Sequence, residues 1–254
     1  MIERFNIEES IQTAKKPALV AFITAGHPTL DEFIKNLKAI SKIADVIEIG
    51  IPFTDPLADG LSIQNSSLKA LQSGASLVWT LDAIKENRDE IECPLILMSY
   101  LNPLLAFGFE KLASASKDAG IQGFIVPDLP IEESFSFKEA INTQNINLIN
   151  LVSPATPEDR LGRLCKESQG FVYAVTKKGV TGGNDDLPDD VIKYLQKVKK
   201  SSSVPVCAGF GIRGKDQVDQ LAPHIDGVIL GSVIIDTIEQ GGNVFKFLEN
   251  IRHD

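Results

Sequence analysis

One unit recurs along the chain: a short apolar run rich in β-branched residues, then a polar turn, then a segment with helical apolar spacing. It occurs eight times, and most of the apolar runs are nearly continuous, which is typical of parallel strands covered on both faces. The expected strands are 18–24, 46–51, 94–98, 123–126, 147–152, 171–175, 204–208 and 227–230. The expected helices are 30–43, 68–72 with 79–87, 109–119, 132–142, 157–167, 188–199, 216–221 and 244–251.

Eight βα units joined by right-handed crossovers predict an α/β fold, a single (β/α)8 TIM barrel. An open doubly wound sheet is the alternative, but no glycine fingerprint follows the first strand. The 254 residues fit one barrel, so we expect residues 1–254 to form a single domain. Residues 2–16 precede the first strand and predict an extra N-terminal helix that closes the amino-terminal end of the barrel.

The charge pattern excludes several classes of partner. The net charge is −9, with 25 basic and 34 acidic residues, and the one basic run is 197–200. We therefore expect no nucleic acid and no membrane as a partner. The three cysteines are widely spaced without a CxxC pair, and no apolar run is long enough to span a bilayer. These features predict a cytoplasmic protein with no metal site.

The most unusual residue in a predicted strand is Glu48, which interrupts an apolar, β-branched run. Asp59 lies on the connection that follows the same strand, after several turn-forming residues. Chemistry in a TIM barrel takes place at the carboxyl ends of the strands, so both acids are candidate catalytic groups. A purely structural interpretation stays open from these residues alone: Glu48 as an interior ion-pair partner, and Asp55 or Asp59 as a turn former.

Glycines cluster after the last two predicted strands, at Gly209 and Gly211 and at Gly231 with Ser232. Loops at this place in a barrel, with a helix N-terminus, often bind phosphate through backbone N–H groups. The alternative is that these glycines only form tight turns. The glycine-rich segment 177–184 follows the sixth strand and predicts a lid, whose Thr181 and Gly182 could complete the phosphate site.

Several motifs stand in order along nearly the whole chain. The longest is Ile47 to Gly60, which reads IEIGIPFTDPLADG and is followed by Ile63 and Gln64. The others are FITAG at 22–26, MSYLNP at 98–103, VPDLP at 126–130, GVTG at 179–182, GFGI at 209–212 and GS at 231–232. Together these motifs resemble those of the tryptophan synthase alpha subunit family. His27 departs from the family pattern, at a position outside the catalytic set.

The resemblance implies a carbon–carbon lyase that cleaves indole-3-glycerol phosphate to indole and glyceraldehyde 3-phosphate. It implies Glu48 as the acid that protonates indole C3, and Asp59 as the carboxylate that binds the indole N–H, oriented by Thr24 and Tyr173. Substrate-binding residues implied in the same way are Phe22, Thr24, Tyr100, Ile125, Tyr173 and Phe210. The implied phosphate-binding residues are Thr181, Gly182, Gly209, Gly211, Gly231 and Ser232.

The resemblance also implies a partner. This is a tryptophan synthase beta subunit in an α2β2 heterotetramer, which would consume the indole in L-tryptophan biosynthesis. Pyridoxal phosphate is expected only in that subunit, and no cofactor is expected in this chain. The implied contact residues are Pro52, Asp55, Asn102 and Pro130. Three alternatives stay open: another phosphate-binding barrel enzyme such as an isomerase, a free-standing indole-releasing lyase, and a catalytically weak barrel that acts as an allosteric partner.

Overall fold

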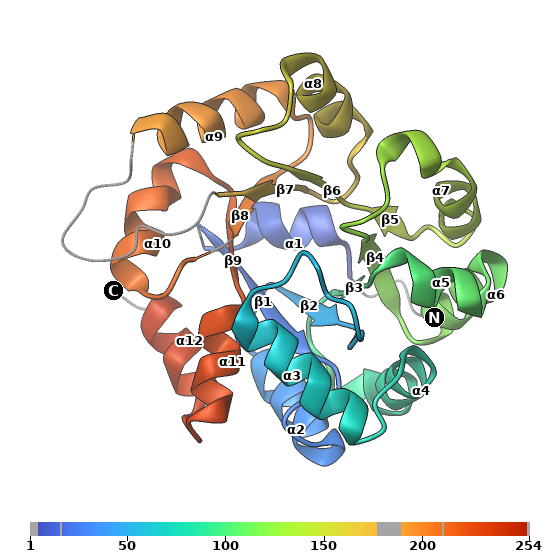
Figure 1. Ribbon diagram of the computed structural model, residues 1–254. Helices are drawn as coiled ribbons and strands as arrows, with labels where there is room; N and C mark the ends of the chain where they lie inside the picture. Colours follow the sequence, from blue (N-terminus) through green and yellow to red (C-terminus); the bar gives the residue numbers. More distant parts are fainter. Residues whose placement is uncertain (1–4, 16, 177–188, 210, 253–254) are drawn as a thin grey trace.

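The computed structural model describes residues 5–15, 17–176, 189–209 and 211–252. Figure 1 shows the strands at the centre and the helices around them. The strands of the described part are β1 (Ala18–Thr24), β2 (Val46–Gly50), β3 (Leu95–Met98), β4 (Ile121–Ile125), β5 (Asn147–Leu148), β6 (Asn150–Val152), β7 (Val172–Val175), β8 (Val206–Gly209) and β9 (Gly227–Leu230).

All strand pairs are parallel, and their order is β5-β4-β3-β2-β1-β9-β8-β7-β6. The two ends of this order, β5 and β6, are consecutive in the chain and separated only by Ile149. The Ile149 N–H donates to the Phe124 carbonyl at 2.9 Å, which continues the pairing with β4. The predicted strand 147–152 is therefore one strand with a break, paired on both sides, and it closes the sheet into the predicted TIM barrel.

The helices are α1 (Ile7–Thr13), α2 (Leu30–Ile40), α3 (Leu61–Gln72), α4 (Leu77–Asn87), α5 (Leu101–Phe107), α6 (Phe109–Asp118), α7 (Phe135–Asn142), α8 (Glu158–Glu167), α9 (Asp189–Ser201), α10 (Lys215–Leu221), α11 (Ser232–Glu239) and α12 (Val244–Arg252). Three short 3-10 helices are η1 (Arg88–Glu90), η2 (Ile131–Glu133) and η3 (Ala222–His224). The sequence did not predict α5 and α11, and α3 begins seven residues before the predicted start. No helix in the described ranges is long and apolar enough to cross a membrane.

Helix α1 confirms the predicted N-terminal closure of the barrel. Asn6 caps it by accepting from the Glu9 N–H at 3.0 Å. Ile7 and Ile11 are fully buried and belong to the same apolar cluster as Val20, Val46 and other strand residues of the barrel interior. Figure 1 shows α1 behind the ring of strands, on the side away from the loop between β2 and α3. The opposite end of the barrel is left for a functional site.

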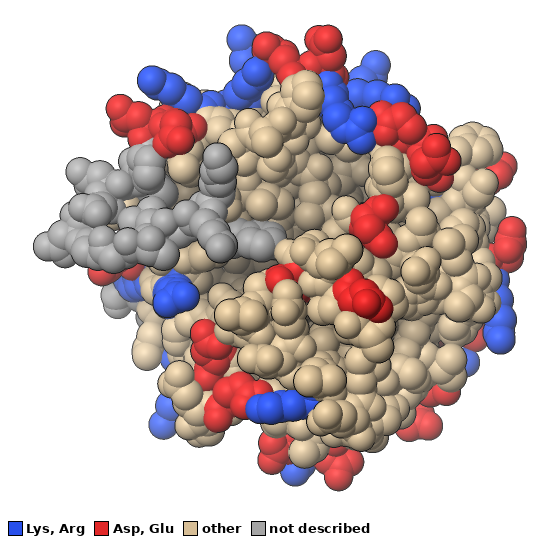
Figure 2. Space-filling model, in the orientation of Figure 1, with Lys and Arg blue, Asp and Glu red and all other residues tan. Residues whose placement is uncertain are grey.

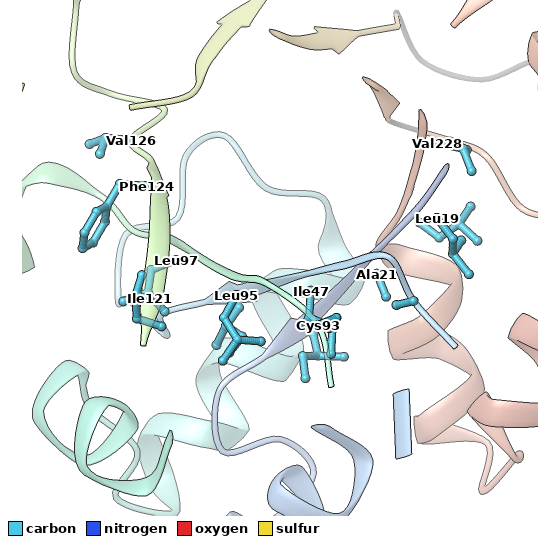
Figure 3. Packing of buried hydrophobic residues seen from close by; sticks show 14 of the residues in the cluster. Leu19, Ala21, Ile47, Cys93, Leu95, Leu97, Ile121, Phe124, Val126 and Val228 are labelled. Atoms are coloured by element: carbon cyan, nitrogen blue, oxygen red, sulfur yellow. The ribbon is translucent and has the colours of Figure 1, made fainter. Parts of the chain in front are cut away.

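Two apolar clusters, one on each face of the sheet, decide where Glu48 points. The larger cluster lies between the strands and the surrounding helices and includes Leu19, Ala21 and Ile47 (Figure 3). The smaller one fills the barrel interior and includes the alternate residues Val20 and Val46. Since successive side chains of a strand point to opposite faces, Glu48 shares the interior face of β2 with Val46.

Candidate active site

Glu48 is an ionisable residue buried inside the barrel. It pairs in register with Phe22 of β1 and Ile96 of β3 and is 1% exposed. Neither of its carboxyl oxygens has a hydrogen-bond partner within the described ranges. Burial, and secondly the nearby charge of Asp59, raise the pKa of Glu48 from 4.5 to about 8. Glu48 therefore holds a proton at neutral pH, and that proton is available for donation to a ligand.

Asp59 lies in the loop between β2 and α3, and two side chains hold it in place. The Tyr100 hydroxyl lies 3.0 Å from Asp59 Oδ2, and the Gln64 side-chain amide donates to the Asp59 carbonyl at 2.8 Å. Burial raises the pKa of Asp59 from 3.8 to about 6, while the hydrogen bond from Tyr100 acts in the opposite direction. Asp59 is thus mainly a carboxylate at neutral pH.

Glu48 and Asp59 line one cavity of about 110 Å³. Five further residues expected in the site from the sequence also line it: Phe22, Tyr173, Gly211, Gly231 and Ser232. The cavity adds Gly60, Ile63, Met98, Ile212 and Ile229, which were not expected. Met98 and Ile229 lie near the carboxyl ends of β3 and β9, so their place in the barrel is the signal that could have identified them. The lining is mostly apolar and surrounds two carboxyl groups.

The other expected site residues within the described ranges do not line this cavity. The Thr24 hydroxyl is 2.7 Å from the Ser66 hydroxyl of α3, and its role in orienting Asp59 stays a prediction. Tyr100 lies behind Asp59 as its hydrogen-bond partner, outside the cavity lining. Ile125 is fully buried in the interior cluster. The expected residues Phe210, Thr181 and Gly182 lie outside the described residues, as does the predicted lid segment 177–184.

Two glycines make room for the aromatic rings that line the cavity. A Cβ atom on Gly50 would lie 2.5 Å from the Phe22 ring, and one on Gly209 would lie 2.6 Å from the Tyr173 hydroxyl. Gly209 was expected to bind phosphate, but it ends β8, and its carbonyl accepts from the Thr176 N–H and hydroxyl. Close packing against Tyr173 is a sufficient physical reason for glycine at this position.

Helix α11 begins at the cavity. Gly231 is its N-cap residue, Ser232 is its first residue, and both line the cavity together with Gly211. Gly211 has a φ of +81°, which favours glycine. No Lys or Arg is among the described lining residues, and on this face Figure 2 shows most basic side chains toward the periphery. Any anion here would have to be held by backbone N–H groups and the helix dipole.

The residues expected at a partner interface lie on the loops after β2 and β4 and, for Asn102, at the start of α5. Asp55, Asn102 and Pro130 are exposed, whereas Pro52 is buried, so its side chain offers little surface for contact. Large apolar side chains are also exposed in the same loop region, with Leu57 at 93% and Leu61 at 77%. Exposed apolar side chains grouped beside a site are typical of an interaction surface.

Two larger hollows lie elsewhere on the molecule. One, of about 320 Å³, lies between the segment 126–134 and helix α8, and the other, of about 780 Å³, lies between α7 and α8. Neither is lined by a buried titratable side chain. Residues 5–15, 17–176, 189–209 and 211–252 contain no group of three His, Cys, Asp or Glu side chains placed to hold a metal ion. The cavity with Glu48 and Asp59 is therefore the candidate active site.

The chain is similar to known proteins over almost its whole length. The sequence profile of the family described as tryptophan synthase alpha chain matches residues 9–250. The chain is 38% identical to the tryptophan synthase alpha chain of Nitratidesulfovibrio vulgaris, over 94% of this chain and 93% of that one. It is 41% identical to that of Bacillus mycoides, over 88% and 87% respectively. A chain in the structure of the tryptophan synthase α2β2 complex of Pyrococcus furiosus superposes with a TM-score of 0.88 at 32% identity, covering 94% of this chain and 98% of that one.

Proposed function

The chain belongs to the family of tryptophan synthase alpha chains, and we propose that Glu48 and Asp59 divide the acid–base work of its reaction. Members of the family cleave indole-3-glycerol phosphate to indole and glyceraldehyde 3-phosphate and pass the indole to a beta subunit. The chain is accordingly a carbon–carbon lyase of tryptophan biosynthesis. One observation carries the assignment of roles: two carboxyl groups share a mostly apolar cavity but differ in protonation at neutral pH.

The reaction needs an acid and an anion at the same time. The neutral Glu48 donates its proton to indole C3, which places a positive charge on the ring nitrogen. The Asp59 carboxylate accepts a hydrogen bond from the ring N–H and stabilises that charge. The ionised Glu48 then removes the proton of the side-chain hydroxyl, and the bond between C3 and that carbon breaks. The bonding electrons return to the ring as indole, and the hydroxyl carbon leaves as an aldehyde.

The apolar cavity contributes in two ways. Phe22, Ile63, Met98 and Ile229 exclude water around the indole ring, and this strengthens the interaction between Asp59 and the developing charge. The same exclusion of water keeps Glu48 protonated at neutral pH. The pair should therefore give a bell-shaped dependence of kcat/KM on pH, with an acid limb near the pKa of Asp59 and an alkaline limb near that of Glu48.

The phosphate group fits the N-terminus of α11. We place it against the backbone N–H groups near Gly231 and Ser232, with Gly211 on the other side, since all three line the cavity. The helix dipole and the close backbone approach that glycine permits supply the attraction. This leaves the indole end of the substrate toward Glu48 and Asp59.

The proposed partner is a pyridoxal-phosphate-dependent beta subunit, in an α2β2 assembly like that of the Pyrococcus furiosus relative. Pyridoxal phosphate belongs to that partner, and this chain's own chemistry uses side chains and backbone alone. The exposed Asp55, Asn102 and Pro130 and the apolar Leu57 and Leu61 provide a contact surface around the cavity. A cytoplasmic location is proposed with it, supported by three cysteines that are all buried and free.

Indole release by the purified chain tests this function. The wild type should form indole from indole-3-glycerol phosphate, and Glu48→Gln and Asp59→Asn should each lower turnover by about 10² to 10⁴. Glu86→Gln, at an exposed position of α4, is the matched control and should keep wild-type turnover. Circular dichroism verifies folding. Near-normal turnover in Glu48→Gln would overturn the assignment of the catalytic acid. Activation of indole release by an added beta subunit would support the synthase and exclude a free-standing lyase.

A further inference from the structure

Tyr100 connects β3 to the loop that holds Asp59. Its hydroxyl lies 2.9 Å from the Ala58 backbone nitrogen and 3.0 Å from Asp59 Oδ2. The Ala58 N–H can only donate, so the hydroxyl oxygen accepts from it. The single proton of the phenol is then directed to the Asp59 carboxyl group. The backbone therefore orients the hydroxyl so that it favours an ionised Asp59.

Tyr100 is itself held firmly. Its side chain is 5% exposed, and its ring stacks on Phe53 with the centroids 5.2 Å apart and the planes inclined by 26°. The next residue, Leu101, begins α5, and its N–H donates to Asp128 Oδ1 at 2.9 Å. Tyr100 thus has a fixed place between the loop after β2 and the segment after β4, both of which carry residues of the proposed partner surface.

We propose that Tyr100 is the positioning residue for Asp59: it occupies Oδ2 and directs the other carboxyl oxygen to the indole N–H. The inference rests on the proposed function, since it concerns how Asp59 is prepared for that reaction. Tyr100 acts through Asp59 and lies outside the cavity lining, so it needs no contact with the substrate. Its removal should impair the chemical step more than substrate binding.

The charges around Asp59 show why a donor is needed there. Glu48 from β2 and Tyr173 from β7 share the cavity with Asp59, and neither carries a positive charge in any protonation state. Asp128, which accepts a hydrogen bond from the N–H of the neighbouring Leu101, adds a further negative charge near the Tyr100 hydroxyl. Burial, then the charge of Asp59 and last that of Asp128, raise the pKa of Tyr100, so its hydroxyl keeps the proton that it donates. Without that donor, burial would raise the pKa of Asp59 beyond about 6 and toward neutral pH.

The test compares Tyr100→Phe with Tyr194→Phe. The control residue lies on α9, and its hydroxyl donates to the Val152 carbonyl at 2.8 Å, so this variant also loses one tyrosine hydrogen bond. The first measurement is the titration of the Asp59 carboxyl carbon by NMR in ¹³C-aspartate-labelled protein, with Asp59→Asn to assign the signal. Tyr100→Phe should raise the pKa of Asp59 by about one unit, and Tyr194→Phe should leave it unchanged.

The second measurement is indole release as a function of pH. The acid limb of kcat/KM, which reports the free enzyme, should move upward by the same amount in Tyr100→Phe. This is roughly a five-fold loss of kcat/KM near the pKa of Asp59, due to kcat with little change in KM. An unmoved Asp59 titration, or an equal loss in Tyr194→Phe, would overturn the role of Tyr100. The NMR titration needs no substrate. A shifted titration in a chain that releases no indole would therefore overturn the proposed function alone.

Discussion

Glu48→Gln should increase the stability of the protein at neutral and alkaline pH while it removes most of the activity. The pKa of Glu48 is about 8 in the folded protein and 4.5 in an unfolded chain. Between these values the folded protein binds one more proton than the unfolded chain, so the free energy of unfolding falls as pH rises through this window. Above the folded pKa both forms are ionised and the loss is complete. Glutamine does not ionise, so the free energy of unfolding of the variant does not fall through this window.

The size of the effect follows from the difference between the two pKa values. That difference is about 3.5 units, and at 1.36 kcal/mol per unit the wild type loses up to about 5 kcal/mol across the window. About two-thirds of the loss is already present at neutral pH. At acid pH the protonated Glu48 and a glutamine are nearly equivalent neutral groups. The stability difference between variant and wild type should therefore grow from near zero at acid pH to its maximum in mild alkali.

Urea unfolding at a series of pH values measures this difference. Trp79, the single tryptophan, packs against Phe33 at 5.8 Å between ring centroids and reports unfolding by fluorescence. Glu86→Gln on the exposed face of α4 is the control, and its curve should stay parallel to the wild type at every pH. A difference between Glu48→Gln and wild type that does not change with pH would refute the reasoning, since Glu48 would then carry no buried proton.

Three further changes test the walls and the rim of the cavity. Gly209→Ala should displace the Tyr173 ring, because the added methyl would lie 2.6 Å from its hydroxyl; a crystal structure with an unmoved ring would contradict this. Gly231→Ala fits sterically, since its Cβ would lie 3.6 Å from the nearest atom of Phe22. It should nevertheless weaken the binding of glycerol 3-phosphate about ten-fold and the binding of indole less, as measured by calorimetry. Asp55→Ala should reduce activation by an added beta subunit without lowering the basal rate of indole release, and full activation of this variant would exclude coupling through its loop.

The sequence was most informative where one local signal dominates. The eight strands were predicted because their apolar, β-branched runs are bounded by turn residues, and Glu48 was conspicuous because it breaks such a run. Helix α11 was missed because its apolar start at Val233 continues the run of β9 almost without interruption. The first turns of α3 were missed because Ser62, Gln64 and Asn65 give little apolar periodicity. That residues 1–254 form one domain stays a prediction.

The contacts that position the site residues depend on the closed barrel and were harder to predict from the sequence. Tyr100 and Asp59 are 41 residues apart, and only the pairing of β2 with β3 brings the segments that follow these strands together. The Thr24 hydroxyl was expected to orient Asp59, and its contact with the Ser66 hydroxyl of α3, 42 residues away in the chain, was not predicted. The sequence therefore singled out the two carboxyl groups that line the cavity, whereas the hydrogen-bond partner of Asp59 depends on how the segments after β2 and β3 are arranged.

The protonation of Glu48 in the presence of an ionised Asp59 is the central claim, and infrared difference spectroscopy tests it directly. The carbonyl stretch of a protonated carboxylic acid that disappears in Glu48→Gln reports this side chain alone. The account predicts that this band is present at neutral pH and is lost with a midpoint near 8, while the corresponding band for Asp59 is lost near 6. A Glu48 band already absent at neutral pH would contradict the account, because the cavity would then contain two carboxylates and no acid to protonate indole C3.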